Sequence, residues 1–128
     1  MAVNAQIDAA RCHAAIRVRD LDTVVRFYRD TLGIPVQFTR GDPARPDAFF
    51  FPGVQLVRAG DQDIGDKGVF DHVGLAVSNL DAIVEGLAAA GIPLDVPLTD
   101  LSREFGTRVR LVFIRDPEGN RVELVQWG

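Results

Sequence analysis

The chain contains one sequence pattern twice, and this repeat restricts its fold more than any other feature. The segment that opens with His13 continues with an aliphatic residue, valine, leucine and aspartate, and the segment that opens with His72 has the same residue types in register. Two further blocks recur in the same order, residues 33–36 as 91–94 and residues 54–57 as 122–125. Ordered self-similarity of this kind marks a repeated structural unit. We therefore expect two similar modules from an old duplication, with an insertion at 95–107 in the second.

Each copy begins with a strand and a helix. Residues 13–18 and 71–77 are short apolar or alternating runs rich in β-branched residues, which is typical of strands. An apolar stripe at helical spacing follows each run: Leu21, Val24, Val25, Tyr28 and Leu32 in the first copy, and Leu80, Ile83, Val84 and Leu87 in the second. Gly33 and Gly91 are expected to end these helices, because each is followed two residues later by a proline.

Three strands follow the helix in each copy. We expect them near residues 36–39, 48–51 and 54–58, and near residues 94–98, 108–114 and 121–126. The residues from Asp116 to Asn120 favour a turn between the last two strands. The unit is therefore βαβββ, used twice. A chain of 128 residues suits a single domain over residues 1–128, with one module at 11–60 and the other at 69–127.

Composition and charge restrict the partners. The chain has 14 basic and 18 acidic side chains, a formal net charge of -4, without a block of like charge, so we expect no nucleic-acid partner. No apolar run approaches the roughly 20 residues that span a bilayer, and residues 1–10 lack a basic-then-apolar leader. The single cysteine, Cys12, allows no internal disulfide. We expect a cytoplasmic protein without a membrane partner.

Strand alternation places four polar side chains at equivalent positions of the two modules. His13 lies near the start of the first strand of its module and Gln55 lies on the last strand, while His72 and Glu123 have the same places in the second module. The apolar neighbours of these residues alternate to the opposite, helix-packing face. Two imidazoles, a carboxylate and an amide oxygen are suitable ligands for one divalent first-row metal ion.

Each of these residues also has an ordinary structural interpretation. A single histidine on a strand is more often a structural or surface residue than a ligand, and a strand glutamine such as Gln55 is commonplace. His13 and His72 are, however, the only histidines in the chain, and they occupy equivalent positions. Glu123 lies within an apolar strand, where a buried carboxylate is costly unless it is paired or metal-bound. These two observations favour the metal site.

Three motifs resemble the vicinal oxygen chelate superfamily. They are His-x-x-Ile-x-Val-x-Asp-Leu-Asp from His13, Phe27-Tyr28-x-x-x-Leu32-Gly33, and Asp116-Pro117-Glu118-Gly119-Asn120-x-x-Glu123-Leu124. The superfamily includes glyoxalase I, methylmalonyl-CoA epimerase, extradiol dioxygenases, and fosfomycin-resistance and bleomycin-binding proteins. The resemblance covers residues 11–127. It implies a glyoxalase-like α+β fold, in which two tandem βαβββ modules form a curved mixed sheet around a metal cleft.

The resemblance also implies a reaction type. Metal-using members take ligands from the first and last strands of each module, here His13, Gln55, His72 and Glu123. This set is similar to those of glyoxalase I and methylmalonyl-CoA epimerase, which implies one divalent metal ion (Zn, Ni, Co, Mn or Fe) and proton transfer through a metal-stabilised enolate. The expected function is a metal-dependent lyase or isomerase acting on a small oxygenated substrate. Glu123 is the expected proton-transfer group, and Asp47 is the nearest counterpart of the epimerase's second acid.

Two arginines are candidates for binding the substrate. Arg17 and Arg121 alternate onto the face that carries the ligands, and a planar guanidinium can bind two oxygens of an anionic group at once. Modules of this superfamily pair either within one chain or across a dimer, and we expect a homodimer. Trp127 near the end of the chain is either a dimer contact or a cover for its own core.

Two alternatives stay open. The first is an Fe(II) extradiol-type dioxygenase, because His13, His72 and Glu123 also form a two-histidine, one-carboxylate triad. Ring-cleaving dioxygenases of the superfamily use an additional histidine and a tyrosine, whereas this chain has no third histidine and its single tyrosine, Tyr28, lies in the first helix pattern. The second is a non-catalytic drug-binding resistance protein. Retention of all four ligand positions is evidence against it.

Overall fold

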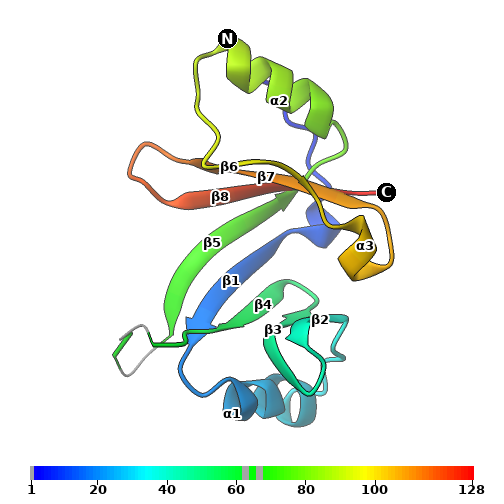
Figure 1. Ribbon diagram of the computed structural model, residues 1–128, viewed down its shortest axis with the longest axis vertical. Helices are drawn as coiled ribbons and strands as arrows, with labels where there is room; N and C mark the ends of the chain where they lie inside the picture. Colours follow the sequence, from blue (N-terminus) through cyan, green and yellow to red (C-terminus); the bar gives the residue numbers. More distant parts are fainter. Residues whose placement is uncertain (1, 62–63, 66–67) are drawn as a thin grey trace. The chain divides into compact units, whose positions relative to one another are not determined.

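The computed structural model describes residues 2–61, 64–65 and 68–128, and the chain forms two compact units. One unit contains residues 13–71, and the other contains residues 1–12 together with residues 72–128. Each unit contains one copy of the sequence repeat. Figure 1 labels the helices and strands.

The unit of residues 13–71 is a four-stranded mixed sheet with one helical segment packed on it (Figure 1). Its elements are β1 (His13–Val18), α1 (Leu21–Arg26), a π-helical turn (Phe27–Thr31), β2 (Phe38–Asp42), β3 (Arg45–Phe51) and β4 (Val54–Arg58). The strand order is β2-β3-β4-β1, in which β1 and β4 are parallel and the other pairs are antiparallel. The first strand of the module therefore lies beside its last strand.

The apolar side of α1 packs on one face of this sheet. Leu21 and Val25 on the helix are buried against Phe51 and Leu56 on the strands. The helix begins after Asp20, whose carboxylate accepts a hydrogen bond from the backbone amide of the third helical residue at 3.1 Å. This bond satisfies one of the amides that a helix start leaves without a partner.

The predicted stripe of this helix is wrong at its last position. Leu32 was expected on the buried side, but it is 52% exposed. The reason is the π-helical turn, in which the amide of Leu32 donates to the carbonyl oxygen of Phe27 at 2.9 Å. A five-residue hydrogen-bond spacing adds one residue to the turn and rotates the following side chain away from the stripe.

The unit of residues 1–12 and 72–128 repeats the topology. Its elements are a 3₁₀ turn (Ala9–Arg11), β5 (Val69–Ala76), α2 (Leu80–Ala89), β6 (Val96–Asp100), α3 (Ser102–Phe105), β7 (Val109–Arg115) and β8 (Arg121–Trp127). The strand order is β5-β8-β7-β6, with β5 parallel to β8 and the other pairs antiparallel. The predicted α+β fold of two βαβββ modules is therefore confirmed. The short helix α3 lies within the insertion expected at 95–107.

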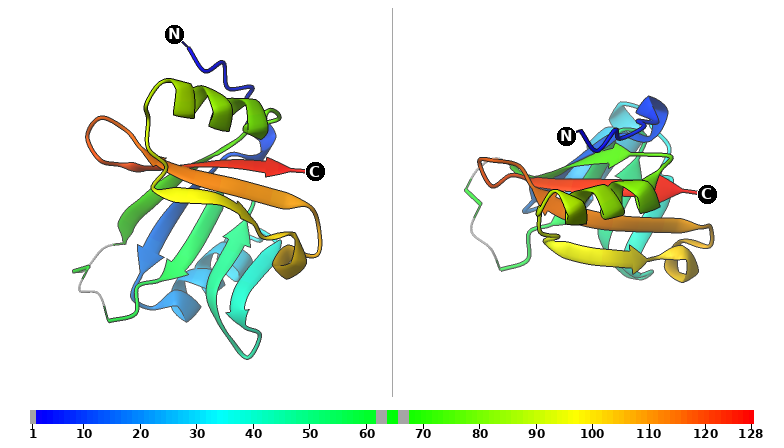
Figure 2. Two further views of the ribbon diagram at one scale, coloured as in Figure 1. Left: turned by 45° about the horizontal axis from the view of Figure 1, so that its top comes forward. Right: turned by 90° about the horizontal axis from the view of Figure 1, so that it is seen from above.

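The helix α2 lies along the sheet formed by β6, β7 and β8 (Figure 2). Leu80, Ile83 and Leu87 recur along one side of this helix, are at most 4% exposed, and pack against Val112 and Leu124. The predicted stripe of the second helix is confirmed at these positions. These apolar side chains of α2 cover one face of the sheet. The polar side chains that are expected to bind a metal ion therefore lie on the other face.

The segment before β1 packs on the second module. The backbone amide of Asp8 donates to the carbonyl oxygen of Ala76 at 2.7 Å, and Ile7 forms an antiparallel bridge with Val77. Val3 packs on α2, where a Cβ added at Gly86 would approach it to 3.1 Å. Sequence patterns did not indicate this contact, because it joins residues that are distant in the chain.

Trp127 covers the core of its own unit. Its ring lies 5.9 Å from the ring of Phe105, and the guanidinium of Arg11 lies 5.5 Å from its centroid. Of the two roles considered for this residue, the structure supports the core contact.

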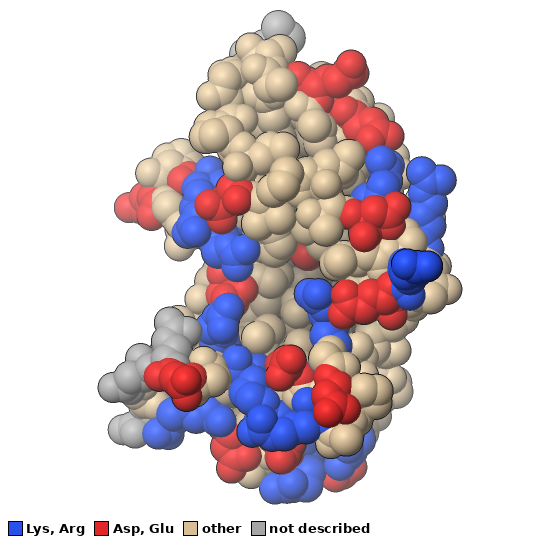
Figure 3. Space-filling view, viewed as in Figure 1, with Lys and Arg blue, Asp and Glu red and all other residues tan. Residues whose placement is uncertain are grey.

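Charged side chains of both signs lie next to one another on the face shown in Figure 3. Among the described residues, no helix is long and apolar enough to cross a membrane.

The turn between β7 and β8 depends on Asp116. Its carboxylate accepts hydrogen bonds from the backbone amides of Glu118 and Asn120 and from the side chain of Asn120, each at 2.9 Å. The bond from the Asn120 side chain, followed by the backbone bonds, lowers the pKa of Asp116. A lowered folded-state pKa stabilises the protein above the unfolded-state value, about 4, and this stabilisation is lost as the pH falls through the folded-state pKa.

We therefore predict that Asp116→Asn lowers the Tm at pH 7, and that its difference from wild type shrinks as the pH falls below about 4. Thermal melts followed by circular dichroism between pH 2 and pH 7 measure this difference. Glu118→Gln, in the same turn, is the control and should follow the wild-type curve. A difference that stays constant across this pH range would contradict the prediction.

Candidate metal centre

In the unit that contains β5 and β8, the structure brings His72 and Glu123 together. Glu123 is in register with Gly74 on β5, and His72 lies two residues before Gly74, so the two side chains share one face of the sheet. The Nε2 atom of His72 and the Oε1 atom of Glu123 are 3.9 Å apart. Both residues are buried, at 4% and 8% exposure. His72 and Glu123 therefore share the face that strand alternation predicted for them.

Two more side chains surround this pair. Phe113 on β7 lies directly opposite Glu123, and its ring centroid is 5.0 Å from that of His72, with the ring planes at 86°. The guanidinium of Arg121 lies 4.2 Å from the Phe113 centroid, and its Nε is 3.5 Å from Oδ2 of Asp95. Sequence reasoning selected Arg121 but missed Phe113, because a phenylalanine in an apolar strand is ordinarily a core residue.

In the other unit, His13 and Gln55 occupy the equivalent positions. Gln55 is in register with Ala15, and His13 lies two residues earlier on β1, so His13 and Gln55 share a face. Gln55 is 8% exposed, and no other described residue donates to or accepts from its side-chain amide. Its amide oxygen is the atom that Gln55 can offer to a metal ion.

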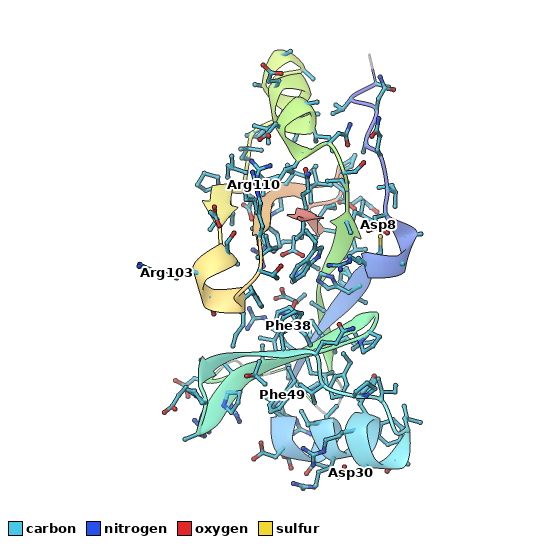
Figure 4. All side chains as sticks on the ribbon, turned by 90° about the vertical axis from the view of Figure 1, so that its right-hand side faces the viewer. Asp8, Asp30, Phe38, Phe49, Arg103 and Arg110 are labelled. Carbon is cyan, nitrogen blue, oxygen red and sulfur yellow. The ribbon has the colours of Figure 1, made fainter. Side chains whose placement is uncertain are left out.

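An aromatic wall adjoins Gln55. Phe50 on β3 lies opposite Gln55, and Phe38 on β2 lies opposite Phe50 with the two ring centroids 6.4 Å apart. Figure 4 shows Phe38 on the other side of this sheet from Phe49, which lies toward α1. The neighbours of Gln55 on the β2–β3 side of this face are therefore aromatic, a setting in which a polar contact to a ligand is partly shielded from water.

Arg17, one of the two predicted anion-binding residues, is paired inside its own unit. Its Nε lies 2.6 Å from Oδ1 of Asp71, and the Asp71 side chain is only 10% exposed. A substrate anion would have to compete with this carboxylate for the guanidinium.

Asp47, the predicted second acid, lies at an irregular part of the β2–β3 pair. The register of the two strands shifts beside it, its residue is exposed, and a Cβ added at Gly41 would lie 2.5 Å from its Oδ2. Phe50, the cross-strand neighbour of Gln55, is three residues further along β3, about 10 Å at the rise of a strand. The structure therefore does not bring Asp47 to the Gln55 position.

The donor set suits one divalent metal ion. Two ligand bonds of about 2.1 Å span at most roughly 4.2 Å, and the 3.9 Å between Nε2 of His72 and Oε1 of Glu123 falls within this reach. That separation is also too long for a direct hydrogen bond between these atoms. The imidazoles of His13 and His72 and the carboxylate of Glu123 are all groups that bind divalent first-row metal ions.

Comparison with known sequences gives a family and named relatives. The chain matches the model of the glyoxalase/bleomycin resistance protein/dioxygenase superfamily over residues 12–124. Lactoylglutathione lyase of Haemophilus influenzae is 25% identical to it, over 89% of this chain and 90% of that protein. A probable lactoylglutathione lyase of Synechocystis is 28% identical, over 89% and 92% of the two chains.

Comparison with solved structures gives the same fold. Methylmalonyl-CoA epimerase from Mycobacterium tuberculosis aligns with a TM-score of 0.65 and 22% identity, over 98% of this chain and 92% of that one. The 2,3-dioxygenase LapB from Pseudomonas sp. KL28 aligns with a TM-score of 0.71 and 16% identity, over 98% of this chain and 44% of that one. The Mn(II)-bound glyoxalase from Novosphingobium aromaticivorans aligns with a TM-score of 0.67 and 20% identity, over 95% and 40%.

The ligand set leads to a prediction for stability. Adding Zn²⁺ or Ni²⁺ to metal-free protein, at a concentration 100 times its Kd, should raise the free energy of unfolding by about 2.7 kcal/mol, because the ion binds only the folded state. Differential scanning calorimetry measures this gain. His72→Ala should abolish it, and Asp47→Asn, the matched control, should keep it in full. An undiminished gain in His72→Ala would contradict the assignment.

Proposed function

Because the chain belongs to the glyoxalase/bleomycin resistance protein/dioxygenase superfamily, we propose that it is a metal-dependent lyase or isomerase that moves a proton on a small oxygenated substrate. The observation that carries this proposal is the buried pair of His72 and Glu123, at 3.9 Å, on the sheet face away from α2. A buried carboxylate is ordinarily paired or metal-bound, and one beside a histidine can also serve as a proton-transfer group. The lyase names of the relatives support an enzyme of this class.

We assign the metal ligands to His13, Gln55, His72 and Glu123. When bound, the metal ion supplies Lewis-acid stabilisation of negative charge on a substrate oxygen. The two imidazoles and the amide are neutral ligands, so Glu123 contributes the single negative charge of the set. A divalent ion held in this way keeps a net charge of about +1, which favours an oxyanionic substrate.

Glu123 is the proposed proton-transfer group. It is 8% exposed and lies between strand neighbours that are apolar, and this environment favours exchange of a proton with a bound substrate carbon over exchange with water. Asp47 is exposed and distant from the cross-strand neighbour of Gln55, so its setting supports this role less.

The relatives named lactoylglutathione lyase make lactoylglutathione the first compound to test. Its glutathione part carries carboxylates, and we propose that Arg121 binds such a group. The guanidinium carbon lies 4.2 Å from the Phe113 centroid, and a guanidinium on an aromatic ring can still donate to two carboxylate oxygens. Arg17 has the same chemistry but is paired with Asp71 at 2.6 Å.

The division of roles predicts different defects in four variants. Glu123→Gln should abolish proton transfer while some metal stays bound, because a neutral amide can still ligate but cannot accept the proton. His13→Ala and His72→Ala should lose the metal, since imidazole forms strong bonds to these ions. Gln55→Ala should have the smallest effect, because a water molecule can replace an amide oxygen.

The measurements are metal stoichiometry and exchange of substrate hydrogen for solvent deuterium, with wild type and Asp47→Asn as controls. Exchange by Glu123→Gln at the wild-type rate would show that Glu123 is not the base. Loss of exchange in Asp47→Asn, with exchange retained in Glu123→Gln, would transfer the role to Asp47.

An Fe(II) extradiol-type dioxygenase is the second candidate, since His13, His72 and Glu123 also suit Fe(II) and LapB shares the fold at a TM-score of 0.71. Oxygen uptake by the Fe(II)-loaded protein with catechol separates the two functions. We expect no uptake above that of the His72→Ala variant, because Gln55 adds a fourth protein ligand and no third histidine is present in the chain. Uptake that depends on His72 would favour the dioxygenase.

Three further statements stay predictions: assembly as a homodimer, a cytoplasmic location, and the alternative that the protein binds a drug without catalysis. A metal-free protein that folds fully and binds no added metal would favour the last.

A further inference from the structure

We propose that Phe113 is a positioning residue for His72: supported on its face by Arg121, it sets the plane of the His72 imidazole and so the metal affinity of the site. The inference rests on the metal site proposed above. Phe113 carries no polar atom and cannot itself bind a metal ion, so it can affect the site only through the side chains that it contacts.

The first observation is the contact between the two rings. The centroids of Phe113 and His72 are 5.0 Å apart and the ring planes are at 86°, an arrangement that aromatic pairs favour. The second side-chain torsion of a histidine has a broad energy profile, so a neighbouring group must select the plane of the ring. Phe113 is 8% exposed and His72 is 4% exposed, so water has little access to the contact.

The second observation is that Phe113 is itself held in place. The guanidinium of Arg121 lies 4.2 Å from its centroid, within the range of a cation–π contact. The Nε of Arg121 is 3.5 Å from the carboxylate of Asp95, and the backbone amide of Asp95 donates to the carbonyl oxygen of Phe113 at 2.7 Å. These contacts form a closed loop from Phe113 through Asp95 and Arg121 back to the ring of Phe113.

The third observation is that Phe113 is the cross-strand neighbour of Glu123. Opposite residues on antiparallel strands have Cβ atoms about 4.5–5.5 Å apart, so one ring adjoins both the carboxylate and the imidazole. The other module has the same arrangement, with Phe50 opposite Gln55. Arg121, by contrast, aligns in the repeat with Gly53, so only the second module carries the arginine support.

Hydrogen-bonding groups that orient metal-bound histidines typically change metal affinity by 10–100-fold when they are altered. A ring contact lacks the hydrogen bond, so we expect Phe113→Leu to raise the Kd for Zn²⁺ and Co²⁺ by about tenfold, the lower end of that range, measured by titration calorimetry on metal-free protein. Phe113→Tyr keeps the ring and should stay near wild type. Phe51→Leu is the matched control: it removes a buried ring from the core beneath α1, so it should lower the Tm without changing the Kd.

A second readout does not depend on metal or activity. The chain has two histidines, so nitrogen-15 spectra of the imidazoles in metal-free protein can be assigned with a His13→Gln variant. The His72 signals should shift or broaden in Phe113→Leu and not in Phe51→Leu. If Phe113→Leu does not fold, Phe113→Met, a closer match in volume, serves for the same comparison.

An unchanged Kd and unchanged His72 signals in Phe113→Leu would overturn the positioning role while leaving the proposed function intact. An equal rise of the Kd in Phe51→Leu would also overturn it, because the effect would then follow from lost stability. If wild type binds no metal, the metal site fails. The imidazole spectra then decide separately whether Phe113 orients His72.

Discussion

The site depends on the parallel pairing between the first and last strands of each module. β1 pairs with β4 and β5 pairs with β8, so Ala15 is in register with Gln55 and Gly74 is in register with Glu123. A parallel pair cannot be joined by a tight turn and needs a long connection. Here the helix and the two intervening strands form that connection. The helix covers one face of each sheet, which leaves the other face for the polar side chains.

The polar face of the second module holds two buried ionisable side chains. Glu123 is 8% exposed and His72 is 4% exposed, and their side chains approach to 3.9 Å. Carboxylates and histidines are seldom placed inside a protein unless they are paired or bind a metal ion. Their occurrence together on one face therefore supports the proposed metal site.

The two modules are equivalent in backbone and unequal in chemistry. Gln55 and Glu123 occupy the same strand position, but only Glu123 carries a charge. Each faces a phenylalanine on the neighbouring strand, Phe50 or Phe113. Arg121 lies over the ring in the second module alone, where the repeat has Gly53 in the first. Divergence after duplication therefore left the carboxylate at this strand position, and the arginine over the ring, in the second module.

The amino-acid sequence alone determined the order of strands and helices and the four polar positions, because periodicity and the internal repeat are local patterns that need no knowledge of contacts. Phe113 and Phe50 are equivalent through their cross-strand partners, Glu123 and Gln55, but the sequence repeat does not align them, and a phenylalanine in an apolar strand is ordinarily a core residue. Tertiary structure decided the rest. The π-helical turn directs the Leu32 side chain outward, Asp71 forms an ion pair with Arg17 at 2.6 Å, and the Phe113 ring packs edge-to-face with that of His72. The contacts of Arg17 and Phe113 join residues far apart in the chain, which strand and helix periodicity does not specify. The turn at Leu32 is a local departure from the α-helical spacing that the periodic pattern assumes.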